Sequence, residues 1–305
     1  MLQHRELNRS IIAGLMPDNA AQSQRETPVE QSALEERVNA VIARLRSERK
    51  NQGAKRGLAT QLAVTLDEWL RTDEPEFLDR SDYNDEDKVK IVAKLNRFNR
   101  VVQAYWRFLL ILKPYIEHLH KTENRKIRIL ELASGSGEFT LALAERAQKQ
   151  KLPVEIFGSD YIEAHVQEGN RKAREKGIAA EFRNINAFDM HNVRTGEFDI
   201  IFIAQTMHHF TPGQLAKMVA QASEKASYAF IGIDGRRGLD LFGLLPGMWM
   251  LNPHFGFMHD SVISMRKMYS EPELELIANC AAPDHRVSAF SALPGYSVLE
   301  VLRPV

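Results

Sequence analysis

Short apolar runs alternate with helical stretches over the second half of the chain. The apolar runs predict buried strands at residues 127–132, 153–160, 180–186, 198–205 and 228–234. Helical stretches, such as residues 138–146 and 212–226, lie between them. Such alternation is typical of a mostly parallel sheet with helices on both faces. The sequence therefore predicts a doubly wound α/β fold.

The first part of the chain predicts helices instead of strands. Apolar residues recur at helical spacing in residues 30–49 and again in residues 58–71. Residues 1–30 are rich in Asn, Gln and Ser, so we expect roughly these first 30 residues to be poorly ordered. Both helices carry an apolar face that needs a partner surface.

An acidic connection at residues 72–85 separates these helices from the rest of the chain. A further helix is expected to begin near Asp85 and to carry its apolar face as far as Leu109, before Pro114 interrupts it. We therefore divide the chain into a helical extension, residues 1–77, and a main domain, residues 78–305.

A turn of small residues follows the first strand, and an acid, Glu131, lies near the end of that strand. A turn with so little side-chain bulk lets a ligand approach the backbone and allows positive φ. The helix after it directs free N–H groups toward the turn. The turn consists of Ala133, Ser134, Gly135, Ser136 and Gly137.

Two kinds of nucleotide cofactor use this layout, and the residues favour one of them. A dinucleotide fingerprint has a third glycine where this chain has Thr140. The acid at Glu131 would also repel a phosphate, whereas it would attract the ammonium and sulfonium of S-adenosylmethionine. The turn thus favours S-adenosylmethionine.

Residues after the next strands extend this cofactor site. Asp160 ends the second strand, where a carboxylate can accept both ribose hydroxyls. Asn186 follows the third strand, where its amide oxygen can accept a hydrogen bond from the adenine amine. The other cofactor candidates that follow these strands are Tyr161, Ala187, Phe188 and Gln205.

With these residues the chain resembles the class I S-adenosylmethionine-dependent methyltransferases, over roughly residues 78–305. The sequence ELASGSG at residues 131–137 looks like the family's first motif, with Ala133 where many members have glycine. Asp160 matches the acid of the second strand, and Asn186–Ala187 stands where Asp-Ala is more frequent.

A narrower similarity is to uncharacterised small-molecule methyltransferases related to the quinone-biosynthesis methylases. It rests on LNRFNR at residues 95–100, the His208–His209 pair and residues 259–274. The resemblance implies a seven-stranded sheet that ends in a hairpin with one antiparallel strand, and Pro294–Gly295 supplies a hairpin turn. It also implies that the helices before the first strand form a lid over the pocket.

His208 and His209 follow the fourth strand, at the sheet edge where ligands bind, and are the candidate catalytic bases. A structural role for both residues is an equal alternative, because histidine is often half buried. His259 is a second base candidate, with a solvated loop histidine as the alternative. No pair of histidines has the spacing of metal ligands on a helix, so no metal site is predicted.

Substrate contacts are expected from the end of the fifth strand and from the apolar stretch at residues 239–251, within an insertion near residues 239–265. That stretch can form a pocket wall or a patch that dips into a membrane surface, and the weakly basic surroundings favour the wall. A surface ion pair is the alternative for an arginine here. The candidate substrate-binding residues are Tyr105, Asp234, Arg236, Phe242, Trp249 and Arg266.

Composition narrows the classes of partner. Lys plus Arg and Asp plus Glu number 40 each, so no net charge attracts nucleic acid or an anionic membrane. The single cysteine, Cys280, fits a reducing compartment, and we predict a cytoplasmic protein. No apolar segment has the length of a membrane span.

Three function classes follow. The first, which we favour, is O- or C-methylation of a small apolar or aromatic molecule. The second is methylation of protein or RNA, which the balanced charge and the sequence AQTM at residues 204–207 disfavour. The third is a catalytically weak partner protein that acts through its N-terminal helices.

Overall fold

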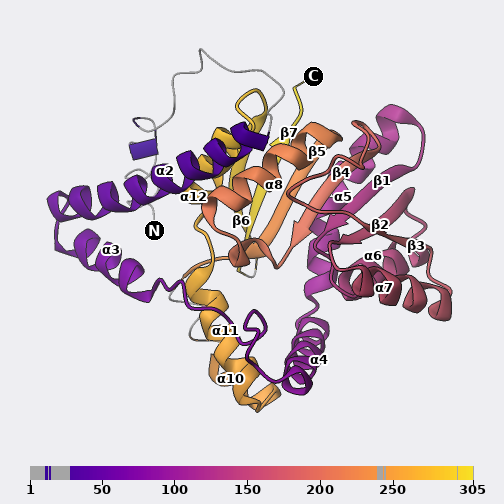
Figure 1. Cartoon of the computed structure of the whole chain (residues 1–305), viewed down its shortest axis with the longest axis horizontal. Coiled ribbons are helices and arrows are strands. Elements are labelled where there is room, and N and C mark those ends of the chain that lie inside the picture. Colours follow the sequence, from indigo (N-terminus) through magenta and orange to yellow (C-terminus); the bar gives the residue numbers. More distant parts are fainter. Residues whose placement is uncertain are drawn as a thin grey trace.

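The computed structural model of the chain describes residues 11–12, 14, 28–238, 243, 245–293 and 295–304 (Figure 1). Most of the N-terminal stretch that we predicted to be poorly ordered lies outside the described residues, and so does Phe242. The strands are β1 (Ile127–Leu132), β2 (Val154–Asp160), β3 (Ala180–Asn184), β4 (Phe198–Ala204), β5 (Ala226–Gly235), β6 (Arg286–Ala292) and β7 (Tyr296–Leu302).

The strands form one seven-stranded sheet in the order β3-β2-β1-β4-β5-β7-β6. Neighbouring strands from β3 to β5 are parallel, whereas β7 is antiparallel to both β5 and β6. The predicted fold and its single antiparallel strand are therefore confirmed. Since β1 and β4 are neighbours, the residues that follow Leu132 and Ala204 lie at the same edge.

Helices cover both faces of the sheet, as the strand–helix alternation predicts. On one face, α8 (Pro212–Lys225), α12 (Glu271–Ala281) and the long α2 (Pro28–Lys55) share a core with strand residues such as Phe230. On the other face, α5 (Ala104–Glu123) and α6 (Glu138–Lys149) pack on residues such as Phe202. Helix α7 (Glu163–Lys176) packs beside β2 and β3.

Helix α2 is part of this core. It lies along α8 and α12 (Figure 1), and its residues Leu34, Val38, Ile42 and Leu45 are fully buried there. Gly213 in α8 permits the close approach, because a Cβ on it would lie 2.3 Å from the Glu35 carbonyl oxygen. Helix α3 (Leu58–Leu70) follows α2, as predicted, and leaves Trp69 exposed.

The single helix predicted from Asp85 is wrong, because the structure has two. Helix α4 (Asp85–Val101) ends where Gln103 adopts a left-handed φ of 55°, and α5 begins at Ala104. Helix α5 then runs through Pro114, where an interruption was predicted. The apolar residues on both sides of that proline hold the helix against the sheet, with Phe108, Leu112 and Ile116 buried.

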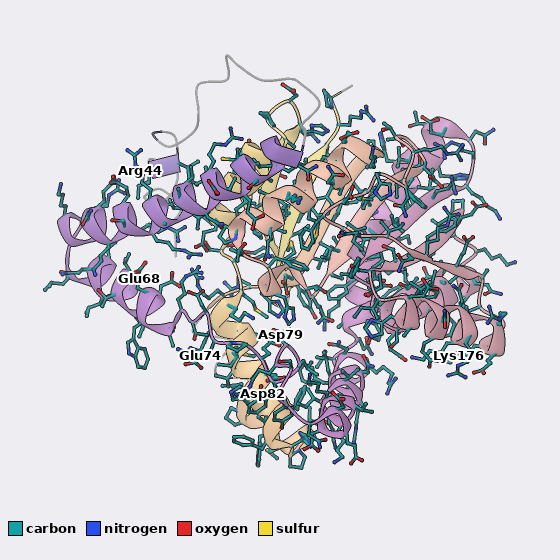
Figure 2. The ribbon with its side chains drawn as sticks, in the orientation of Figure 1. Arg44, Glu68, Glu74, Asp79, Asp82 and Lys176 are labelled. Atoms are coloured by element: carbon teal, nitrogen blue, oxygen red, sulfur yellow. The ribbon has the colours of Figure 1, made fainter. Side chains whose placement is uncertain are left out.

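Three helices gather at one end of the sheet, beyond the ends of β4 and β5 (Figure 1). They are α4, α10 (Leu245–Leu251) and α11 (Phe255–Lys267). Helices α4 and α11 approach closely, since a Cβ on Gly256 would lie 2.8 Å from Ile91. The connection between α3 and α4 also passes here and carries Asp79 to the side of α11 (Figure 2).

Candidate functional site

The turn after β1 has the backbone conformation that its small residues allow. Ala133, Gly135 and Gly137 have φ values of 50°, 55° and 79°, so the chain turns through the left-handed region three times within five residues. Gly137 then caps the start of α6. Gly137 is also required for packing, because a Cβ there would lie 2.2 Å from the Phe182 ring.

The same Phe182 ring fills the space over Gly158 on β2, where a Cβ would lie 2.4 Å from it. Helix α6, β2 and β3 therefore meet around one aromatic ring. This contact provides the close helix–strand packing that the third glycine of a dinucleotide fingerprint provides elsewhere.

Ala133 gives a direct test of the turn geometry. Replacing it with glycine is expected to raise the free energy of unfolding by roughly 0.5–1 kcal/mol, because a side chain in the left-handed region is strained. Ala142→Gly, the same substitution inside α6, is expected to lower it by about 0.5–1 kcal/mol. Urea unfolding of the two variants checks the opposite signs, and a loss of stability in Ala133→Gly contradicts the strain.

Glu131 differs from the ionised acid that the sequence predicts. Its side chain is buried and accepts a hydrogen bond from the Thr140 hydroxyl. Burial raises the pKa of Glu131 to about 8, although the Thr140 bonds act in the opposite direction. The carboxyl is therefore largely neutral at pH 7, and it ties β1 to α6 instead of presenting a charge to the turn.

Asp160 holds the turn against the end of β2. Its Oδ2 accepts the Gly135 N–H at 2.9 Å, and its Oδ1 accepts the Ile162 N–H at 2.9 Å. Tyr161 beside it is exposed. On the next loop, the Asn186 Oδ1 accepts the Phe188 N–H at 2.9 Å, so this amide shapes the loop. The three loops lie at one edge of the sheet, where the cofactor is predicted to bind.

A pair of amides joins helix α4 to the end of β4. The Asn99 side chain donates to Gln205 Oε1 at 2.9 Å, and the Gln205 side chain donates back to Asn99 Oδ1 at 3.2 Å. Asn99 belongs to the LNRFNR sequence and is buried. Gln205 has a φ of 57°, which turns the chain toward His208 and His209.

His208 is enclosed by two carboxylates. Its Nδ1 lies 2.9 Å from Asp234 Oδ2, which also accepts the His208 backbone N–H, and its Nε2 lies 3.5 Å from Glu76 Oε1. Burial alone would lower the pKa of His208, but Asp234 and Glu76 together raise it to about 10. The two carboxylates therefore favour the protonated form of this ring, whereas a catalytic base must be neutral to accept a proton.

The His209 side chain is more exposed to solvent than that of His208, and its ring also faces Glu76. Its Nδ1 lies 3.1 Å from Asp79 Oδ2, and its Nε2 lies 3.9 Å from Glu76 Oε2. Glu76 also accepts a hydrogen bond from the Ser264 hydroxyl at 2.9 Å. The Lys267 ammonium lies 3.9 Å from Glu76 and 3.6 Å from Asp79.

A cavity of about 240 Å³ lies beside this cluster, under α4 and α11. Glu76, His208 and His209 line one part of it, together with Asp234 and Gln205. Much of the remaining wall is apolar and includes Leu95, Phe98, Val102, Met248, Phe257 and Met268.

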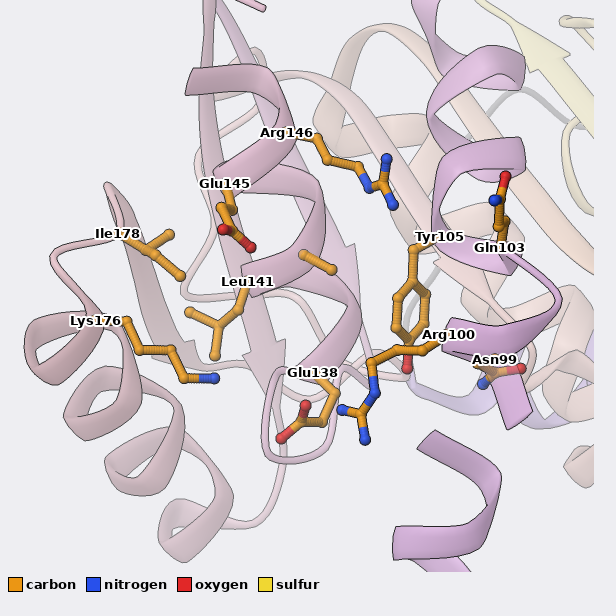
Figure 3. Close-up of a pocket in the computed structure, with 11 residues that line it drawn as sticks. Asn99, Arg100, Gln103, Tyr105, Glu138, Leu141, Glu145, Arg146, Lys176 and Ile178 are labelled. Carbon is orange, nitrogen blue, oxygen red and sulfur yellow. The ribbon is translucent and has the colours of Figure 1, made fainter. Parts of the chain in front are cut away.

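Among the predicted substrate-binding residues, Asp234 lines this cavity, but its carboxylate is engaged by His208 and by the Gly235 N–H. Tyr105 lines a separate polar cavity of about 310 Å³ between α5 and α6 (Figure 3). Trp249 is on α10, with its neighbour Met248 in the cavity wall.

Three other predicted residues make contacts elsewhere. The Arg266 guanidinium donates to the Leu70 carbonyl at 2.7 Å. The backbone of Arg236 donates to Gly295. His259 is in α11 instead of a loop, stacks on Phe77 with 3.8 Å between ring centroids, and lies 3.0 Å from Asp260.

Glu76 is the main site residue that the sequence analysis missed. It lies in the acidic connection that we predicted to be a simple linker, yet only 3% of it is exposed. Phe257 in α11 and Met268 just after it were also missed. The available signal was Pro75–Glu76–Phe77, where one acid stands between two apolar residues in an otherwise polar segment.

One protein family matches part of the chain in sequence. Residues 129–225 match the family described as "Methyltransferase domain". This part of the chain is similar to that family. The matched residues include most of β1 and all of β2 to β4, with the glycine turn, Asp160 and both adjacent histidines. No curated protein matches the chain in sequence.

Solved structures of methyltransferases have folds similar to that of this chain. The plantazolicin methyltransferase BpumL in complex with SAH has a TM-score of 0.52 at 14% identity, over 72% of this chain and 92% of that one. BamL, another plantazolicin methyltransferase, in complex with a triazolic desmethylPZN analog and SAH, has a TM-score of 0.52 at 14% identity, over 71% and 91%.

Magnesium protoporphyrin IX methyltransferase (ChlM) from Synechocystis PCC 6803, with bound SAH, has a TM-score of 0.43 at 17% identity, over 67% of this chain and 87% of that one. The likeness to the plantazolicin enzymes shows that the chain has the Rossmann-like fold of the class I methyltransferases. None of the helices in the described ranges is long and apolar enough to cross a membrane.

Proposed function

We propose that the protein transfers a methyl group from S-adenosylmethionine to a small molecule with an apolar or aromatic body. The observation that carries this proposal is the cavity beside the end of β4, which has apolar walls and one charged end. An apolar pocket with a few convergent polar groups is typical of small-molecule sites. The substrate's body would lie against Phe98, Phe257 and Met268.

The cofactor side is supported by the turn and by Asp160. The left-handed turn leaves the backbone open to a ligand, and Asp160 stands at the end of β2 where a ribose would lie. Because β1 and β4 are adjacent and parallel, this turn and the histidine segment share one edge of the sheet. SAH in the structures of the plantazolicin enzymes agrees with this choice of cofactor.

The reaction requires the substrate's nucleophilic oxygen or carbon to lie in line with the methyl carbon. The new bond forms to that atom as the sulfonium–carbon bond breaks, and S-adenosylhomocysteine leaves with the electron pair on sulfur. A hydroxyl or an acidic carbon also loses a proton. We assign assistance with that proton to His209 and Glu76, because the His209 Nδ1 is engaged by Asp79 and both residues line the cavity.

Calorimetric titration with S-adenosylmethionine tests the cofactor. We expect binding, and we expect Asp160→Ala to weaken it about 10- to 100-fold, because a carboxylate that accepts hydrogen bonds from ribose contributes about 1.5–3 kcal/mol. Glu163→Ala, three residues later on α7, should bind like the unmodified protein. Absence of any heat, or equal affinity in both variants, would contradict the proposal.

The substrate class is then tested by thermal shift with phenols, quinols and polyketide-like acids in the presence of S-adenosylhomocysteine. Stabilisation by a phenol or quinol supports an aromatic substrate. A Phe257→Ala variant should lose that stabilisation, because this ring is in the cavity wall, whereas binding of S-adenosylhomocysteine should remain.

A further inference from the structure

Three side chains from two distant segments meet at the charged end of the cavity. Glu76, His208 and His209 each offer one atom that lies within 4.8 Å of the other two. Glu76 and His208 are buried, and His209 is partly buried. The sequence predicts no metal site, because no two histidines have the spacing of metal ligands on a helix. Glu76 lies far earlier in the chain than the two adjacent histidines.

Both imidazole rings are oriented by carboxylates on their outer sides. His208 Nδ1 is 2.9 Å from Asp234, and His209 Nδ1 is 3.1 Å from Asp79. Each Nδ1 thus has a carboxylate acceptor, which directs the ring's Nε2 toward Glu76. Metal-binding histidines have this arrangement, in which one ring nitrogen donates to a carboxylate and the other binds the ion.

The distances between the two Nε2 atoms and the Glu76 oxygens suit a bound ion better than direct hydrogen bonds. His208 Nε2 lies 3.5 Å from one Glu76 oxygen, and His209 Nε2 lies 3.9 Å from the other. Hydrogen bonds of this kind are shorter, about 2.7–3.2 Å. Ligands at about 2.0–2.1 Å from a tetrahedral zinc ion are roughly 3.3 Å apart, so modest inward shifts of the side chains would complete the site.

The local charge also matches a divalent cation. Three carboxylates, those of Glu76, Asp79 and Asp234, surround the two rings, and Lys267 is the ammonium in contact with Glu76 and Asp79. With neutral imidazoles, these groups carry two negative charges in excess. The Lys267 ammonium would repel a bound cation. Its shorter contact, 3.6 Å, is however with Asp79, which is not one of the three ligands.

We propose that Glu76, His208 and His209 bind a divalent transition-metal cation, with Zn²⁺ as the first choice, through one carboxylate and two Nε2 atoms. Imidazole and carboxylate together suit such ions. All three residues line the cavity, so the ion would keep a position open to it, as catalytic sites do. Binding of the ion is independent of the proposed function.

A role for the ion rests on the proposed function. A substrate hydroxyl bound to the open position would lose its proton more readily, because a metal ion lowers the pKa of an oxygen bound to it. The methyl group would then pass to that oxygen. In this arrangement His208, His209 and Glu76 are ligands, so His209 and Glu76 no longer assist with the proton, which passes to solvent water in the cavity.

Calorimetric titration of the chelator-treated full chain with ZnCl2 tests the site. We expect one bound ion, and we expect Asp79→Asn to weaken binding roughly 10- to 100-fold, as loss of an outer-shell partner does. His209→Ala and Glu76→Gln remove a ligand and should weaken binding by more than that. His191→Ala, which removes an exposed histidine elsewhere, should leave the affinity unchanged.

Cobalt(II) provides a second measurement on the unmodified protein, which does not depend on the folding of any variant. Visible d–d absorption that appears with one equivalent of Co²⁺ and is displaced by Zn²⁺ supports the site. Lack of Zn²⁺ binding, or the same Zn²⁺ affinity in His209→Ala and Glu76→Gln as in His191→Ala, overturns it. Binding of S-adenosylmethionine to the metal-free chain separates this failure from failure of the proposed function.

Discussion

Glu273→Ala is expected to lower the free energy of unfolding by roughly 3–5 kcal/mol, the loss typical of breaking a buried ion pair. Glu273 is completely buried at the start of α12, where it accepts hydrogen bonds from Arg46 at 3.0 Å and from Arg71 at 2.7 Å. It also lies 3.3 Å from Arg237. Removal of Glu273 would leave these three arginines close together without the carboxylate that offsets their positive charges.

The loss should be measured by urea unfolding against Glu145→Ala. Glu145 forms an exposed pair with Lys149 at 2.6 Å, and such pairs contribute about 0.3–0.5 kcal/mol. A similar, small effect in both variants would show that the buried network does not hold α2, α12 and the end of β5 together.

The pH dependence of stability has a defined sign for the same residue. Burial alone would raise the pKa of Glu273, but Arg237, Arg71 and the two arginines of α2 hold it well below the ordinary value. Its contribution to stability is therefore present above the unfolded pKa, about 4.3, and is lost as the pH falls toward the lower, folded pKa. The free energy of unfolding of Glu273→Gln should therefore fall less steeply with decreasing pH than that of the unmodified chain.

Elements whose pattern is local could be predicted from the sequence. The strands from residue 127 onward and the capped helix after Ser270 depend on neighbours within a few positions, so their apolar periods and capping residues suffice. The break between α4 and α5 could not be predicted in this way. Gln103 adopts a left-handed conformation there, and no glycine or proline marks the position.

Residues of the candidate site could likewise be predicted only where a local sequence pattern places them. Asp160 and the two histidines lie at strand ends, and the alternating pattern alone places them at one edge. Glu76 has no such pattern, because its burial depends on contacts with His208 and Ser264, far along the chain. Likewise, the raised pKa of Glu131 follows from the burial of its side chain, which the sequence of the turn does not reveal.

His209→Ala is expected to lower kcat about 100- to 10,000-fold on the substrate that the thermal-shift panel identifies, while affinity for S-adenosylmethionine stays unchanged. The range is that of assistance in proton removal by one group. Loss of a metal ligand would act in the same direction. His209 is the better test of the two histidines, because His208 is packed between Asp234 and Glu76, and its removal would leave two buried carboxylates without their partner.

Three measurements separate a chemical role for His209 from a structural one. Steady-state kinetics gives kcat, calorimetry gives the cofactor affinity, and thermal unfolding shows whether the fold persists. A large fall in kcat with intact cofactor binding and an unchanged melting temperature supports chemistry at the charged end of the cavity. Equal losses in turnover and cofactor affinity would instead indicate that His209 supports the loop after β4, whereas His191→Ala should change none of the three, since that side chain is exposed beside Asp189.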